Sequence, residues 1–179
     1  PVGFNALSSN NWRDDLGQFK NKTYLPICQI PVSKETGRVR EELLTTFENI
    51  LLRQLDISGP MVTVIKYLIS EAIDNITEHA DVPHGWIMVQ NYPAKEFLDV
   101  CIVDSGIGLL GSYKKSFMDD IGDDASALQY AINGRSTKQI AENRGYGIDT
   151  SRRMLVEGLN GKYFLFSGAA FFGVALQLW

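Results

Sequence analysis

The sequence feature that most constrains the fold is a run of apolar residues at helical spacing. An apolar side chain recurs every third or fourth residue, at Val62, Ile65, Ile69, Ile73 and Ile76. Residues at this spacing share one face of an α-helix, and such a face packs against a core. Ser58-Gly59-Pro60 precedes the run, and proline suits the first position of a helix. We therefore predict a helix that starts near Pro60 and ends between Ala80 and Pro83.

Apolar patterns and turn residues predict the other elements. Residues 39–55 repeat apolar side chains at helical spacing, and Leu25 to Val32 is predicted as an edge strand because Pro26 and Pro31 interrupt it. We expect the later elements to be a hairpin of Trp86–Tyr92 with Phe97–Asp104, a loop over 105–122, a helix over Asp124–Asn133, a mobile loop over 134–147, a helix over Thr150–Glu157, and closing strands at Lys162–Ser167 and Phe172–Trp179. This order predicts an α+β fold, with helices on one face of a mostly antiparallel sheet.

Length and charge limit the classes of function. The chain has 179 residues, which suits one globular domain with its own core. Its net charge of −4 offers no basic surface for nucleic acid or anionic lipid, and no apolar run approaches the length of a membrane span. Cys28 and Cys101 stand in apolar surroundings, so we expect two buried free thiols and a cytoplasmic protein.

The predicted helix also carries an unusual polar stripe. Glu71, Asn75 and either Glu78 or His79 fall on the face opposite the isoleucines, with Asp74 near its edge. A solvated face with chance composition explains such a stripe equally well when the helix is taken alone. For His79 we expect a place at the helix end, near the last carbonyls.

Two glycine-rich segments complete the set. Asp104 ends an apolar strand, where we expect it to be held rigidly and partly buried, and Gly106 and Gly108 follow it. A plain turn would also use Asp-Ser-Gly. Gly145-Tyr146-Gly147 precedes a predicted helix, whose free amides favour phosphate. Neither a Rossmann fingerprint nor a Walker A loop fits these segments, although Lys138 stands where it could reach phosphate.

Together and in this order, the three segments resemble the motifs of the histidine-kinase-like ATPase superfamily, which includes gyrase B, MutL, heat-shock chaperones, histidine kinases and anti-sigma-factor serine kinases. Residues 71–75 match its N box, 104–108 its first glycine box and 144–147 its second. The resemblance covers residues 45–179 and implies a two-layer α/β sandwich with a mixed sheet, the Bergerat ATP-binding fold. Residues 1–44 would be an N-terminal extension packed on the core.

The resemblance also implies roles for single residues. Asn75 would ligate Mg²⁺, Asp104 would accept the adenine amino group, and Gly106 and Gly108 would line the base pocket. Lys138, Gly145, Tyr146 and Gly147 would face the phosphates of ATP. Glu71 would be the general base, because family members that hydrolyse ATP or phosphorylate serine carry a glutamate there.

The sequence leaves three functions open. The first is an Mg-dependent ATPase or protein serine/threonine kinase in signalling, with a regulatory protein partner. The second is the catalytic half of a sensor histidine kinase, although neither His79 nor His84 stands in a phosphoacceptor helix. The third is an interaction module gated by ATP without catalysis. We expect His84 to be exposed in a turn, and the aspartates between 119 and 124 to form a solvated face with a helix cap.

Overall fold

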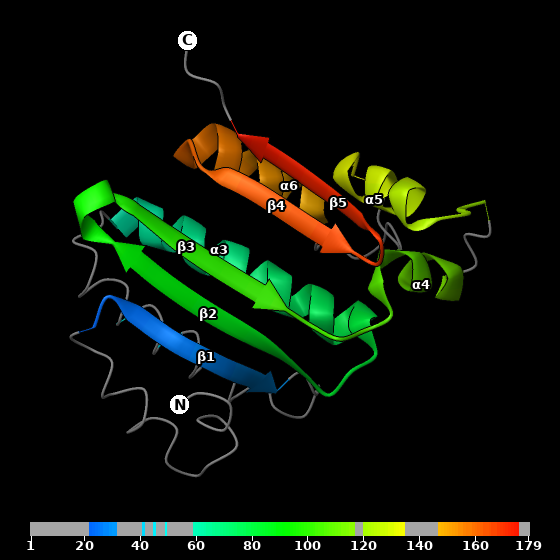
Figure 1. Ribbon diagram of the computed structural model, residues 1–179, viewed down its shortest axis with the longest axis horizontal. Helices are drawn as coiled ribbons and strands as arrows, with labels where there is room; N and C mark the ends of the chain where they lie inside the picture. Colours follow the sequence, from blue (N-terminus) through cyan, green and yellow to red (C-terminus); the bar gives the residue numbers. More distant parts are fainter. Residues whose placement is uncertain are drawn as a thin grey trace. The chain divides into compact units, whose positions relative to one another are not determined.

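The computed structural model describes most of the chain (Figure 1). Its described residues are 22–31, 41, 45, 49, 59–116, 120–134 and 147–175. The chain divides into two compact units, Pro1–Ser105 and Gly106–Trp179. Because the division falls within the segment 104–108, each unit carries part of the predicted motif set.

The first unit contains a three-stranded antiparallel sheet in the order β1-β2-β3. Its strands are β1 (Tyr24–Pro31), β2 (His84–Tyr92) and β3 (Phe97–Val103). A short 3-10 turn, η3 (Pro93–Lys95), joins β2 to β3, and Glu96 after it adopts a left-handed conformation with φ of 55°. The predicted hairpin is therefore confirmed.

Strand β1 lies at an edge of this sheet, as its prolines predict. Its register against β2 shifts between Leu25 and Cys28, at the position of Pro26. Proline has no N–H to donate to a partner strand, so a bulge at an edge accommodates it. Residues 24–31 belong to the segment predicted as an extension, and they supply one strand of the sheet.

Helix α3 (Gly59–Asn75) lies along one face of the sheet (Figure 1). The predicted apolar stripe is buried along its whole length: Val62, Ile65, Ile69, Ile73 and Ile76 are each between 1% and 8% exposed. In the sheet, Leu25, Cys28, Ile87 and Val89 are almost completely buried. A π-helical turn, η2 (Ile76–Ala80), continues α3 to the predicted end. Of the helix predicted over 39–55, the described residues Glu41, Thr45 and Asn49 are helical and exposed.

The second unit combines helices with a two-stranded antiparallel sheet. Its elements are α4 (Gly108–Lys115), α5 (Asp124–Ile132), α6 (Gly147–Arg153), the π-helical turn η4 (Met154–Gly158), β4 (Lys162–Ser167) and β5 (Ala170–Ala175). The core includes Tyr113, Ile121 and Ala127, with Leu109 and Leu110 packed against it. The outward face of β4 and β5 carries three exposed phenylalanines, of which Phe166 and Phe171 stack 5.5 Å apart.

The prediction of a loop over 105–122 was wrong in part, because α4 occupies the middle of this segment. Three glycines suggested a loop, yet Gly111 has a packing role. A Cβ there would lie only 2.7 Å from Ile107 Cβ. The absence of a side chain lets the first turn of α4 close over Ile107, while Tyr113, 3% exposed, anchors the helix to the core.

Two expectations about exposure were also wrong. Cys28 is buried and its desolvation raises the pKa of the thiol to about 11, but Cys101 is exposed. His84 is half-buried as the first residue of β2, and its ring meets Trp86 edge-on with 5.0 Å between ring centroids. Both errors arise from placing single residues by local composition, which does not show which face of a strand is covered.

The α+β class is confirmed by antiparallel sheets packed with helices. Within the described ranges, each strand pairing is antiparallel, and each unit contains one sheet. The predicted domain boundary at residue 44, the loop residues 135–146 and the last residues of the final strand lie outside the described residues.

Candidate functional site

Glu71 and Asn75 occupy the last turns of α3. Both side chains are half-buried, and so is Asp74 between them. The helix buries its isoleucine face, so the polar residues at this end lie at the margin of the covered surface. Carboxylate and amide oxygens placed one helical turn apart can act on a common ligand.

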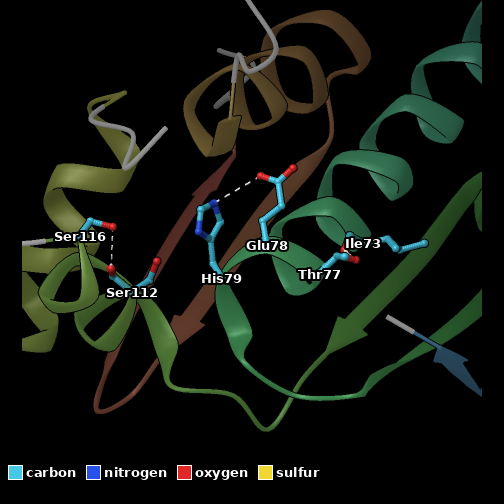
Figure 2. A network of polar contacts seen from close by, with 6 residues as sticks. All are labelled: Ile73, Thr77, Glu78, His79, Ser112 and Ser116. Atoms are coloured by element: carbon cyan, nitrogen blue, oxygen red, sulfur yellow. Dashed lines mark hydrogen bonds and ion pairs between the residues drawn. The ribbon is translucent and has the colours of Figure 1, made fainter. Parts of the chain in front are cut away.

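The chain leaves α-helical geometry immediately after Asn75. In the π-helical turn η2, the hydroxyl of Thr77 donates to the carbonyl oxygen of Ile73 at 2.8 Å. A π-helical residue advances less around the axis than an α-helical one, and π-turns are frequent at functional sites. His79 lies in this turn, and its Nε2 lies 3.7 Å from the Glu78 carboxylate (Figure 2).

Gly85 in β2 marks the place where the asparagine and aspartate segments meet. A Cβ at Gly85 would lie 2.9 Å from Ile76 Cδ1 and 3.1 Å from the carbonyl oxygen of Val103. Ile76 follows Asn75 in the chain, and Val103 precedes Asp104. These two candidate residues therefore stand at the same end of the first unit, each one residue from a shared contact point.

Asp104 follows the last residue of β3, and it is exposed rather than partly buried as predicted. The reason is its strand: β3 lies at the edge of the described sheet, and most of its side chains are exposed. An exposed carboxylate at a strand end is accessible to a ligand N–H.

In the second unit, Gly106 and Gly108 lead into α4. Gly108 has φ of +66°, a conformation that side-chain-bearing residues rarely adopt. The next amide, of Leu109, donates to the hydroxyl of Ser167 at 2.8 Å. The first glycine box is therefore attached to the end of β4.

Gly147 begins α6 with φ of +52°, and a Cβ there would meet open space. The helix is stabilised locally by Arg152, which donates to Asp149 at 2.6 Å. Lys138, Gly145 and Tyr146 lie outside the described residues, so the structure does not bear on their predicted contacts with phosphate.

The sequence did not predict three contacts between distant segments, because local patterns do not show such contacts. They are made by Gly85, Ser167 and Asp124. A glycine inside a strand is the one available signal, since it often marks the close approach of another chain segment. The predicted helix cap is confirmed at Asp123, which accepts the amide of Ser126 at 2.7 Å.

The described residues contain no cluster of three or more His, Cys, Asp or Glu side chains able to hold a metal ion. None of their helices combines the length and apolarity needed to cross a bilayer. A shallow hollow of about 390 Å³ over α5 is lined by Ala125, Ser126, Gln129 and Tyr130, and it contains none of the candidate residues.

The sequence matches no protein-family model and no curated protein, and the structure matches no solved structure.

Proposed function

We propose that this chain is a Mg-dependent ATP-binding domain of the Bergerat type that transfers or hydrolyses the γ-phosphate. The observation that carries the proposal is the close approach of both Ile76 and Val103 to Gly85. These two residues are the chain neighbours of Asn75 and Asp104, which therefore lie at one end of the first unit. A metal-binding amide and a base-binding carboxylate need such a placement to act on one nucleotide.

The donor set suits a nucleotide-bound magnesium ion. Mg²⁺ prefers oxygen ligands and keeps several waters and phosphate oxygens, so one amide oxygen from Asn75 is a sufficient protein ligand. Bound there, the ion would neutralise charge on the phosphates, which an acidic chain with net charge −4 otherwise repels.

Glu71 is the proposed general base. It stands one helical turn before Asn75, so a hydroxyl or water beside the phosphates would lie within its reach. Asp104 would accept a hydrogen bond from the adenine amino group, and Gly106 and Gly108 would let the backbone approach the base. Gly147, with Lys138, Gly145 and Tyr146, would contact the phosphates.

Nucleotide titration of matched aspartate variants tests the proposal. Asp104→Ala removes the adenine acceptor, whereas Asp99→Ala removes an exposed carboxylate from the other end of the same strand. A hydrogen bond to a charged group contributes about 1.5–3 kcal/mol, so Asp104→Ala should weaken ATP binding about 10- to 100-fold. Asp99→Ala should bind ATP as the wild type does. Equal affinities for both variants, or no ATP binding by the wild type, would contradict the proposal.

Turnover is tested separately with Glu71→Gln, and Glu78→Gln, seven residues later in the chain, is its control. A positioned base is worth about 10²–10⁴-fold in rate, so only the first variant should lose phosphate release or transfer. Both variants should retain ATP affinity. ATP binding without turnover by the wild type would instead indicate an ATP-gated interaction module.

A further inference from the structure

The residue before the first turn of α4 supplies no side-chain cap. The first amides of a helix have no partner within the helix, and a Ser, Thr, Asp or Asn before the first turn usually satisfies one of them. Ile107 occupies that position here, and it offers no side-chain hydrogen bond. The hydroxyl of Ser167, 58 residues later in the chain, accepts the amide of Leu109 instead.

The segment around Gly108 packs closely against the end of β4. A Cβ at Gly108 would lie 3.0 Å from Ser167 Oγ and 3.8 Å from the backbone nitrogen of Gly168. Gly108 therefore admits the hydroxyl by having no side chain, while its φ of +66° directs the next amide toward it. The position of the glycine box depends on the place of the β4–β5 turn.

A second helix holds that turn. Ser167 pairs with Ala170, which leaves Gly168 and Ala169 as a two-residue connection, and Gly168 has φ of +58°. The carboxylate of Asp124, in the first turn of α5, accepts the amide of Ala169 at 2.9 Å. A Cβ on Gly168 would overlap that carboxylate.

The α5 start is itself well capped. Asp123 accepts the amide of Ser126, and this bond lowers the pKa of the Asp123 carboxyl. A negative charge at a helix N-terminus is stabilised by the helix dipole, so the charged form of the cap is favoured. The turn between β4 and β5 is thus attached to α5 through Asp124 and to α4 through Ser167.

We propose that Ser167 is a positioning residue for nucleotide binding: its hydroxyl, held by the turn that Asp124 fixes, sets the conformation of the glycine box at Gly106–Gly108. The inference rests on the proposed ATP site. It assigns Ser167 no contact with the nucleotide. Because the glycine box is proposed to line the adenine pocket, the effect of Ser167 should fall equally on all adenine nucleotides.

The test compares Ser167→Ala with Ser167→Thr, which keeps the hydroxyl. Ser116→Ala is the matched control, because the Ser116 hydroxyl donates to the carbonyl oxygen of Ser112 at 3.1 Å, at the other end of the same helix (Figure 2). Ser167→Ala should weaken ATP and ADP binding by the same factor, about 5- to 10-fold. It should raise KM without lowering kcat, and Ser167→Thr should restore affinity.

Amide hydrogen exchange at Leu109 separates failure of this inference from failure of the proposed function. Exchange should accelerate at least 5-fold in Ser167→Ala and stay unchanged in Ser116→Ala. Unchanged exchange in Ser167→Ala overturns the capping role, whether or not nucleotide binds. Faster exchange with unchanged affinity overturns the positioning role. A wild type that binds no adenine nucleotide overturns the proposed function, and the positioning role falls with it.

Discussion

Replacing Gly85 by alanine probes the packing that brings the segments of Asn75 and Asp104 to the same end of the first unit. The added methyl would lie 2.9 Å from Ile76 Cδ1 and 3.1 Å from the carbonyl oxygen of Val103. Overpacking of this kind costs about 1–3 kcal/mol. Alanine recovers about 0.4–1 kcal/mol by restricting the unfolded chain. We therefore expect the free energy of unfolding to fall by about 1–2 kcal/mol.

A second substitution shows where the cost arises. Ile76→Val removes the Cδ1 atom and leaves Cγ2, which is 3.6 Å from the Cβ position at Gly85. By itself this change should cost about 0.5–1.5 kcal/mol. In the Ile76→Val background, Gly85→Ala should lower the free energy of unfolding by about 1 kcal/mol less than it does in the wild type, because the Cδ1 atom closest to the added methyl is absent. The remaining cost would come from Val103, whose carbonyl oxygen cannot be trimmed.

Urea denaturation followed by far-UV circular dichroism gives the four unfolding free energies of this cycle. Gly158→Ala is the control, since a Cβ at Gly158 meets nothing within 4 Å and the residue is helical. That variant should be as stable as the wild type or more stable. Equal costs of Gly85→Ala in both backgrounds, within about 0.3 kcal/mol, would refute the contact between Ile76 and Gly85.

Three further outcomes follow from burial and backbone conformation. Iodoacetamide at pH 8 should label the exposed Cys101 and leave Cys28 unlabelled until the chain is unfolded, and peptide mass spectrometry would show which cysteine is labelled. Labelling of both cysteines in the folded protein would contradict the burial of Cys28. Burial raises the pKa of Cys28 from 9.0 to about 11 and that of Tyr163 from 10.0 to about 12, the latter against the opposing effect of Arg152. Between pH 9 and 12 both groups stay neutral in the folded state, whereas in the unfolded chain they lose their protons. The free energy of unfolding measured in urea should therefore decrease as the pH rises through 9–12. Tyr163→Phe should make the upper part of this decrease less steep. Gly168→Ala should lower the unfolding free energy by at least about 1–2 kcal/mol, the cost of a left-handed alanine, and an unchanged urea midpoint would contradict the turn geometry.

Much of the first unit could be predicted from the sequence because its elements follow from patterns among residues close together in the chain. The stripe from Val62 to Ile76 has a single helical period, and Pro93 separates two apolar runs that can only pair with each other over so short a connection. The segment around α4 could not be predicted in the same way. Its glycines suggest a loop by composition, and the residue that caps the helix, Ser167, is remote in sequence.

The same distinction between local patterns and packing applies to the candidate site. Spacing alone places Glu71 and Asn75 on one face of a helix, and a strand end alone places Asp104. The segments of Asn75 and Asp104 approach each other at Gly85 because of how the chain packs. No periodic pattern in the sequence predicts this approach. Exposure was mispredicted at Asp104 for the same reason: it depends on which neighbouring strands cover β3.

Glycine has two separable purposes in this chain, and they predict different responses to substitution. At Gly85 the backbone is ordinary and only space is lacking, so shortening Ile76 should relieve the part of the strain that its Cδ1 causes, and the Val103 carbonyl oxygen accounts for the rest. At Gly168 both conditions hold, since φ is +58° and the Asp124 carboxylate occupies the space. Shortening Asp124 would remove the overlap there and leave the backbone strain, together with an amide at Ala169 that has lost its acceptor. Replacing a glycine that only admits a neighbour should therefore cost less once the neighbouring side chain is made smaller, whereas replacing a glycine that also sets the backbone should keep the cost of the left-handed conformation.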